Sequence, residues 1–210
     1  MEERYLITQS LLSSWLYCFD CYESGEEKAY EDFLSTLRRE KKEPTEAMLN
    51  GIAFENEVYR EAAGEQRLPH DKWEDGIRAV AANVSGAIVQ LKGQREIEVK
   101  GMKFLVYGIL DALKAGIIYD VKFTNTSLRN ADVYGKYLGS PQHPAYFYVI
   151  PEATEFRYLL SDGEDIYIER YMRGHTPHIS EFIEPFIDYL NSNGLMPLYK
   201  ERWKADARKT

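Results

Sequence analysis

The sequence is poor in cysteine, with only Cys18 and Cys21 among its 210 residues. So few cysteines exclude a disulfide-stapled secreted scaffold and are typical of a reducing compartment. The sequence also lacks an apolar run of about 18 residues, the length that a membrane-spanning helix needs. Its opening segment, MEERYLITQS, has no basic and then apolar pattern of a secretion signal. We therefore expect a cytoplasmic protein without a membrane partner.

Internal repeats, low-complexity stretches and Pro/Gly/Ser-rich linkers are likewise absent from the sequence. A chain of this length without such breaks favours a single domain over residues 1–210. Hydrophobic residues make up 44% and charged residues 29%, the composition of a globular protein rather than of a fibrous or disordered one. The net charge of −8 argues against nonspecific adhesion to nucleic acid over the whole surface, but it leaves room for a local basic track.

The periodicity of apolar residues changes along the chain and divides the predicted domain into three parts. Residues 1–93 show helical spacing, residues 94–150 contain the strands of a sheet core, and residues 151–210 end in a hairpin and a helix. Together they predict the α/β class, with a central mixed β-sheet flanked by helices. The predicted elements are helices at 11–16, 30–37, 45–64, 73–93 and 179–190, strands at 96–99, 102–113, 117–123, 156–160 and 166–171, and a short helix or strand at 142–149.

Two aspartates interrupt the apolar strands of the predicted sheet core. Asp111 ends the run VYGIL, and Asp120 lies within the run IIYDV. Acids inside strands are unfavourable unless they are paired, hydrogen-bonded or bound to a metal. Lys122 follows Asp120 by two residues, so both side chains leave the same face of a strand. Because a tight turn joins the two strands, Asp111 and Asp120 can lie side by side as oxygen ligands that suit Mg²⁺ or Mn²⁺.

A third acid comes from the predicted helix at 45–64. Met48, Ile52, Glu55 and Tyr59 recur at helical spacing, so Glu55 is predicted on the apolar face of this helix. Gly51 lies one turn before Glu55, where a missing side chain would permit the close approach of another element. A glutamate directed at a sheet that already holds two acids needs a cation.

Each acid by itself has a simpler structural interpretation. Asp111 could cap a turn, Asp120 and Lys122 could be a solvated pair, and Glu55 could extend to solvent. The conjunction is much less expected by chance: an inward helical Glu, then a strand Gly-x-x-Asp, then a strand Asp-x-Lys.

In this order and spacing, the residues resemble the PD-(D/E)XK nuclease superfamily, in its RecB-like, Cas4-like and phage-exonuclease-like branch. The resemblance rests on four motifs. They are GIAFE at 51–55, GILD at 108–111, DVK at 120–122 and QHPAY at 142–146, the last matching a Gln-x-x-x-Tyr pattern of this branch. The resemblance implies a restriction-endonuclease-like core.

The resemblance also implies a metal site built from acids. Asp111 and Asp120 would bind Mg²⁺ or Mn²⁺ together with the backbone carbonyl of Val121. Glu55 occupies a helical position that is His in many RecB-like members and Glu in the phage-exonuclease style, and it would bind or support a metal. Whether one ion or two would bind is left open.

Catalytic roles for three further residues follow from the same resemblance. Lys122 would position the attacking water and stabilise the charge that develops on the phosphate. Gln142 and Tyr146 would orient Lys122 or a DNA phosphate. The implied function is that of a metal-dependent DNA nuclease, a hydrolase of phosphodiester bonds.

An exonuclease of recombination or repair type is the leading interpretation, and a phage or prophage origin is left open. A structure-specific or sequence-specific endonuclease is the alternative among enzymes, because the core motifs are shared and the cleavage mode is set by loops. A noncatalytic DNA-binding or scaffolding module that keeps the nuclease fold is the alternative outside enzymes. DNA is the expected partner. A recombination or helicase partner and an oligomer are left open, and no GxxxxGK[ST] motif for ATP binding occurs in the chain.

The cysteine count bears on two metal centres. Cas4-like members hold an iron–sulfur cluster with four cysteines, so with two cysteines we expect no four-Cys cluster here. Cys18, Cys21, His175 and His178 could form a Cys₂His₂ zinc site, although their separation is unlike that of a zinc finger. Helix-end cysteines and loop histidines are the simpler alternative.

Overall fold

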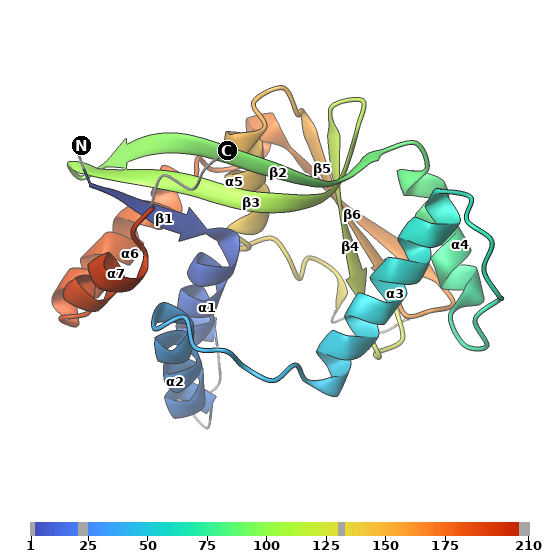
Figure 1. Ribbon diagram of the computed structural model, residues 1–210, viewed down its shortest axis with the longest axis horizontal. Coiled ribbons are helices and arrows are strands. Elements are labelled where there is room, and N and C mark those ends of the chain that lie inside the picture. Colours follow the sequence, from blue (N-terminus) through green and yellow to red (C-terminus); the bar gives the residue numbers. More distant parts are fainter. Residues whose placement is uncertain (1–2, 21–24, 130–132, 206–210) are drawn as a thin grey trace.

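The computed structural model of the chain describes residues 3–20, 25–129 and 133–205. The predicted α/β class is confirmed: a mixed six-stranded sheet is flanked by helices (Figure 1). Within these ranges, no helix combines the length and the apolarity that crossing a lipid bilayer requires. The division of residues 1–210 into one domain stays a prediction.

The helices and strands follow one another in the order drawn in Figure 1. The strands are β1 (Arg4–Thr8), β2 (Ile88–Val99), β3 (Met102–Lys114), β4 (Ile117–Phe123), β5 (Glu155–Ser161) and β6 (Ile166–Met172). The helices are α1 (Gln9–Asp20), α2 (Glu26–Leu37), α3 (Glu46–Ala62), α4 (Glu74–Val84), α5 (Gln142–Val149), the 3₁₀ turn η3 (Arg173–His175), α6 (Ser180–Ser192) and α7 (Met196–Arg202).

Strand β3 organises the sheet because three strands pair with it. Strand β2 runs antiparallel along one edge of β3, where residues 102–110 and 112–113 are paired. The other edge is shared, since β1 pairs in parallel with residues 103–107 and β4 pairs antiparallel with residues 112–114. Residues 108–111 therefore pair with neither strand on this edge. Beyond β4 the sheet continues with β5, which is parallel to β4, and β6, which is antiparallel to β5.

Two-residue turns fix the register on both sides of β3. Lys100 and Gly101 join β2 to β3, with φ values of 50° and 70°. Ala115 and Gly116 join β3 to β4, with φ values of 50° and 76°. Left-handed backbone at both central positions is typical of type I′ hairpin turns, which match the twist of the strands. Both turns were predicted from the sequence, and the antiparallel meander they connect is confirmed.

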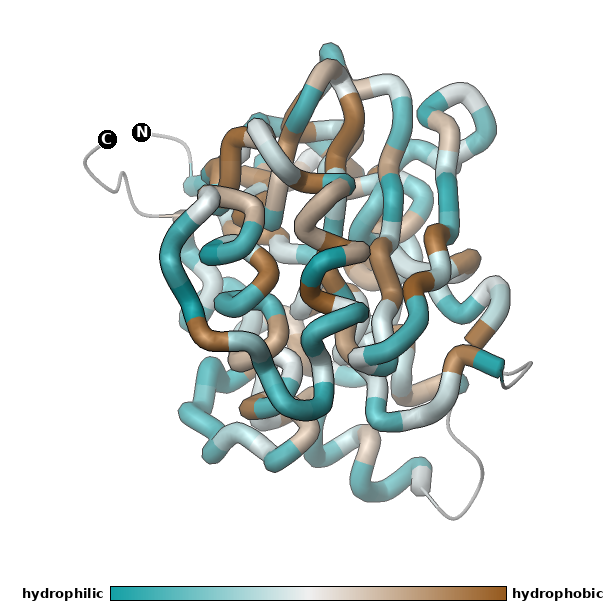
Figure 2. The backbone as a smooth tube through the Cα atoms, turned by 90° about the vertical axis from the view of Figure 1, so that its right-hand side faces the viewer, coloured by the Kyte–Doolittle hydropathy of each residue, from teal (hydrophilic) through white to brown (hydrophobic). Residues whose placement is uncertain are grey.

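The two faces of the sheet pack against different helices. A large apolar cluster joins one face to α1, α2, α5, α6 and α7, and a smaller one joins the other face to α3 and α4. In β4 the neighbours Ile118 and Tyr119 belong to different clusters, as the alternation of a strand requires. Figure 2 shows the hydrophobic segments gathered in the interior, with hydrophilic segments along the outer loops.

The prediction for residues 1–93 is wrong at three places. Arg4–Thr8 forms the strand β1, whose burial alternates along its five residues, a length too short to decide from sequence alone. The fourth helix ends at Val84 rather than at Gly93, because Gly86 takes a left-handed backbone with φ of 74°. Ile88 and the residues after it, whose spacing continued the helical stripe, belong to β2.

The predicted apolar face of α3 is also wrong. Met48 and Ile52 are 56% and 52% exposed, and the buried residues of the helix are Phe54 and Val58. The helix is therefore rotated relative to the prediction, so that Glu55 lies beside the buried stripe rather than within it. Gly51 has no atom within 4 Å of the place where a Cβ would stand, so it marks no close approach.

Two glycines of the sheet allow α5 to approach closely. Gly93 of β2 and Gly108 of β3 face each other in register. A Cβ on Gly93 would lie 2.9 Å from Val149 Cγ2, and a Cβ on Gly108 would overlap the ring of Tyr146 at Cε1. Both neighbours lie on α5, so the absence of these two side chains sets how near the helix lies to the sheet.

We expect Gly108→Ala to lower the free energy of unfolding by about 1–3 kcal/mol, because the added methyl overlaps the buried ring of Tyr146. Gly51→Ala is the matched control. It has free space around it and lies within a helix, so it should raise the free energy of unfolding by up to about 1 kcal/mol. Chemical denaturation of both variants measures the two changes, and an equal effect of the two would contradict the close packing of α5.

Candidate active site

The unpaired stretch of β3 brings two carboxylates together. The ladder between β3 and β4 ends at the pair Ala112 and Tyr119, so the next residues, Asp111 and Asp120, face each other where the strands separate. The carboxylate of Asp111 accepts a hydrogen bond of 3.0 Å at Oδ2 from the backbone N–H of Val121. A side chain thus takes the place of a ladder bond. This bond holds the Asp111 carboxylate against the backbone of β4, the strand that carries Asp120.

Asp120 is 1% exposed, and its two oxygens have different surroundings. Gln142, at the start of α5, donates from Nε2 to Asp120 Oδ1. Lys122 Nζ lies 2.7 Å from Asp120 Oδ2, an ion-pair distance. The buried Asp120 carboxylate is therefore held between an amide group and an ammonium group.

The charges of the site perturb one another. Burial and the neighbouring Asp120 carboxylate raise the pKa of Asp111 well above its usual range, with Glu55 adding to the effect. Burial alone would lower the pKa of Lys122, but the Asp120 and Asp111 carboxylates outweigh it, so the pKa of Lys122 is raised. The raised pKa of Asp111 reflects how unfavourable it is to ionise all the acids beside a single ammonium, and a divalent cation would supply the missing positive charge.

Glu55 reaches the same site from α3. Burial raises the pKa of Glu55, and its carboxylate interacts electrostatically with Asp120 and Lys122. The buried hydroxyl of Tyr59 lies beside it, without an aligned hydrogen bond of its own. From β2, Gln90 donates from Nε2 to Glu55 Oε1 at 3.2 Å. The helical acid is therefore tied to the sheet by an amide side chain.

Gln90 was not predicted as a site residue, and its backbone is unusual. It has φ of 53° within β2, a left-handed conformation that is unfavourable for a residue with a side chain. The pairing of β2 with β3 omits Gln90 and Asp111, which lie between the pairs Val89–Ala112 and Leu91–Leu110. No local pattern in the sequence marks this position, since Gln is not a residue that favours left-handed backbone.

The side chains of β3 change sides of the sheet at the same place. Val106 and Leu110 pack in the large apolar cluster, whereas Ala112 packs in the small one. A regular strand would keep Leu110 and Ala112 on one face. The change occurs at Asp111, opposite Gln90, so the local irregularity of β2 and β3 directs the Asp111 carboxylate toward Asp120.

The row of side chains continues from Asp120 across the next two strands. Asp120 lies opposite Tyr158 of β5, which lies opposite Glu169 of β6. His143 of α5 contacts the Tyr158 hydroxyl through Nδ1 at 3.2 Å, and burial lowers the pKa of His143 to about 4, so the ring is neutral at pH 7. Tyr146, also on α5, donates to the carbonyl of Ile109 at 2.8 Å. α5 therefore fills the unpaired edge of β3.

The structure brings Asp120 into contact with Lys122 and Gln142, and it places Asp111 and Glu55 within electrostatic range of Asp120 and Lys122. Gln142 contacts Asp120 rather than Lys122, and Tyr146 contacts the backbone of β3. Within the described ranges, no three His, Cys, Asp or Glu side chains are gathered closely enough to form a metal site by themselves. Two carboxylates completed by water are nevertheless a common set of Mg²⁺ ligands, and Asp111 and Asp120 supply two carboxylates at one place in the sheet.

The backbone carbonyl of Val121 points toward the same gap. The N–H and C=O of one strand residue leave the strand on the same side. Since the N–H of Val121 is bonded to Asp111, its carbonyl also faces β3, where no strand pairs with it. A carbonyl oxygen is thus available beside the two carboxylates.

The predicted zinc residues are only partly described. Cys21 lies outside the described residues. Cys18 donates its thiol to the carbonyl of Ala29 at 3.5 Å. His175 and His178 are exposed near the start of α6, and His178 Nδ1 contacts the Ser180 hydroxyl at 2.8 Å. The zinc site stays an untested alternative.

Comparison with protein-family models and with curated proteins finds no match for the chain. Similar solved structures include SSO0001, which is 16% identical with a TM-score of 0.49 over 91% of this chain and 79% of that one. LHK-Exo in complex with dAMP is 13% identical with a TM-score of 0.43 over 93% of this chain and 92% of that one. Rai1 of Scheffersomyces stipitis is 13% identical with a TM-score of 0.39 over 90% of this chain and 61% of that one.

We expect Gln90→Gly to be more stable than Gln90→Ala by about 1 kcal/mol, because glycine adopts the left-handed backbone without strain. Both variants remove the amide that donates to Glu55, so the comparison isolates the backbone. Chemical denaturation of the two variants measures the difference. Equal stabilities would contradict a strained backbone at this position.

Proposed function

We propose that the chain is a metal-dependent nuclease that hydrolyses the phosphodiester bonds of DNA. One observation carries the proposal. Asp111 and Asp120 face each other at a break in strand pairing, and the Lys122 ammonium lies 2.7 Å from the buried carboxylate of Asp120. A structural ion pair has no need of the second, half-buried carboxylate of Asp111, whose charge would only add repulsion.

Asp111, Asp120 and the Val121 carbonyl are the proposed ligands of Mg²⁺ or Mn²⁺, with Glu55 as a further or supporting ligand. When bound, such an ion lowers the pKa of a water molecule and neutralises phosphate oxygens. Lys122 would hold a fixed positive charge against the phosphate in the transition state. Its raised pKa keeps the ammonium protonated at neutral pH, so it serves as a charge and a donor rather than as a base.

Gln142 and Tyr146 are proposed as positioning residues. Gln142 holds one oxygen of Asp120 and so directs the other toward Lys122 and the gap. Tyr146 covers the unpaired edge of β3 and keeps water from the Ile109 carbonyl. DNA as the substrate, exonucleolytic cleavage and a role in recombination or repair rest on the resemblance of the four sequence motifs, and they belong to the proposal.

We expect the affinity for Mn²⁺ to rise with pH between about pH 6 and about pH 8. The raised pKa of Asp111 means that the metal-free fold favours the protonated carboxyl, so its stabilising effect is present at low pH and lost as pH rises through the folded pKa. A metal binds the deprotonated form and must displace the proton. Isothermal titration in buffers of different ionisation enthalpy measures the affinity and the proton release. Affinity independent of pH, or the same pH dependence in Asp111→Asn, would contradict this linkage.

The direct test is cleavage of end-labelled linear DNA and closed circular DNA with Mg²⁺, Mn²⁺ or EDTA. We expect metal-dependent loss of linear DNA, reduced about 100-fold or more in Asp120→Asn and in Lys122→Ala. Nicking of circles would identify an endonuclease instead. A folded protein that binds metal but cuts neither substrate would overturn the nuclease proposal in favour of a DNA-binding or scaffolding module.

The chain offers a matched control for these variants. Lys100 and Asp188 form an ion pair on the surface, with side chains 40% and 60% exposed. Asp188→Asn and Lys100→Ala make the same chemical changes as Asp120→Asn and Lys122→Ala, but outside the four motifs. We expect both controls to retain cleavage, and thermal melts of all four variants separate loss of activity from loss of fold.

A further inference from the structure

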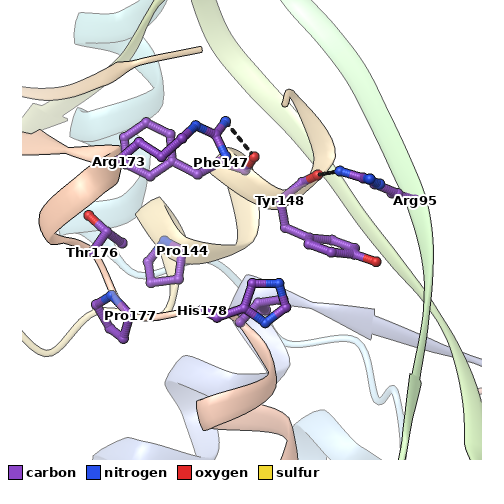
Figure 3. A pocket seen from close by; sticks show the side chains of 9 residues that line it. Arg95, Pro144, Phe147, Tyr148, Arg173, Thr176, Pro177 and His178 are labelled. Carbon is purple, nitrogen blue, oxygen red and sulfur yellow. Dashed lines mark hydrogen bonds between the residues drawn. The ribbon is translucent and has the colours of Figure 1, made fainter. Parts of the chain in front are cut away.

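A cavity of about 260 Å³ lies between β2, α5 and the segment that leads into α6. Figure 3 shows its lining, in which two arginines approach from different elements: Arg95 from β2 and Arg173 from η3. No acid lines it among the described residues. The remaining lining residues are Pro144, Phe147, Tyr148, Thr176, Pro177, His178 and Ile179.

Arg173 is fixed in place with part of its guanidinium unused. Its Nε donates to the carbonyl of Ala153 at 2.6 Å, and its Nη2 donates to the carbonyls of Phe147 and Ile150 at 2.7 and 2.6 Å. A guanidinium carries five N–H donors, of which these bonds use three. The two on Nη1 have no acceptor in the part of the chain that the structure describes.

Arg95 is held against α5 in a similar way. Its Nη1 donates to the carbonyl of Tyr148 at 3.3 Å, and its guanidinium lies 4.9 Å from the centre of the Tyr148 ring. Arg95 forms no ion pair within the described residues. The carboxylate next to it in sequence, that of Glu96, is paired with Arg4. The two arginines thus converge on one cavity without a carboxylate between them.

The carbonyl end of α5 offsets only part of this charge. A helix C-terminus carries roughly half a negative charge, whereas the two guanidinium groups carry two positive charges. The exposed carboxylate of Glu152 also acts electrostatically on Arg173. The arginines disfavour each other's charge, and burial together with Arg95 lowers the pKa of Arg173. In a chain of net charge −8, this is a local excess of positive charge.

We propose that this cavity is a phosphate-binding site, separate from the Asp111 and Asp120 site. Guanidinium groups bind phosphate oxygens through paired N–H donors, which Arg173 Nη1 and the fork of Arg95 supply. The Tyr148 and His178 rings, 5.4 Å apart and edge to face, offer a surface on which a nucleobase can stack. Phosphate binding by these two arginines does not depend on nuclease activity. A nucleotide or a nucleic-acid strand as the source of the phosphate rests on the proposed function.

Helix α5 separates the two sites. Gln142 and Tyr146 lie one turn apart and face the acids, whereas Pro144, Phe147 and Tyr148 line the cavity. At about 100° per residue, these two sets leave opposite sides of the helix. A phosphate in the cavity would therefore lie across α5 from the proposed catalytic metal, at a second point of contact.

The test measures binding in EDTA and phosphate-free buffer, where the metal site makes no contribution. The probes are inorganic phosphate, a deoxynucleoside monophosphate, the same nucleoside without phosphate, and a single-stranded oligonucleotide. We expect phosphate-bearing probes to bind and Arg95→Ala to weaken them about tenfold or more, with a salt slope for the oligonucleotide reduced by about one. Arg173→Ala is avoided as the main variant because Arg173 also holds the end of α5.

Two controls make the outcome decisive. Arg78→Ala removes a surface arginine that is paired with Glu74, and Asp188→Asn removes a surface carboxylate that is paired with Lys100, so neither should change binding in EDTA. Tighter binding of the nucleotide than of the oligonucleotide identifies a free nucleotide as the ligand, and the reverse identifies a strand. No binding of any phosphate by the wild-type protein, or equal binding by Arg95→Ala, would overturn the proposal. Phosphate binding that persists in a protein without nuclease activity would refute only the proposed function.

Discussion

The hydrogen bond from the Val121 N–H to the Asp111 carboxylate lets β3 and β4 separate at the candidate site. It satisfies a backbone donor that would otherwise be left open where β3 and β4 separate, and an unsatisfied buried N–H is unfavourable. The strands can therefore part without a penalty, and the space between them holds a second carboxylate. Two features accompany the break in pairing: β1 and β4 share one edge of β3, and the Asp111 side chain bonds to the backbone of β4.

Buried charge is the second constraint on the site. Asp120 is enclosed by Lys122, Gln142 and the helix that carries Gln142, so its environment comes from two strands and α5 together. Such a cluster contributes little to folding stability, because the desolvation of the ions offsets their attraction. The presence of this cluster at a break in strand pairing is easier to explain by chemistry than by stability.

The sequence predicted the elements that depend on local signals. The turns at Lys100-Gly101 and Ala115-Gly116, the strands that they join and the positions of Asp111 and Asp120 follow from turn chemistry and alternation. The strand β1 was missed because its pairing with β3 joins residues about 100 positions apart, which no local pattern reports. The face of α3 was wrong for a related reason: Met48 and Ile52 have helical spacing, but tertiary contacts bury Phe54 and Val58 instead. Gln90 could not be found, since its role depends on a backbone conformation.

The two-residue turn between β3 and β4 carries a consequence for how the chain can vary. Surface loops generally accept insertions and deletions at little cost. This turn lies at the surface, yet its length sets which residue of β4 stands opposite Asp111. One added residue would shift the register and send the Asp120 carboxylate to the opposite face of the sheet. Homologous chains that differ in length at Ala115 and Gly116 would have lost the geometry of the site while keeping every residue of the motifs.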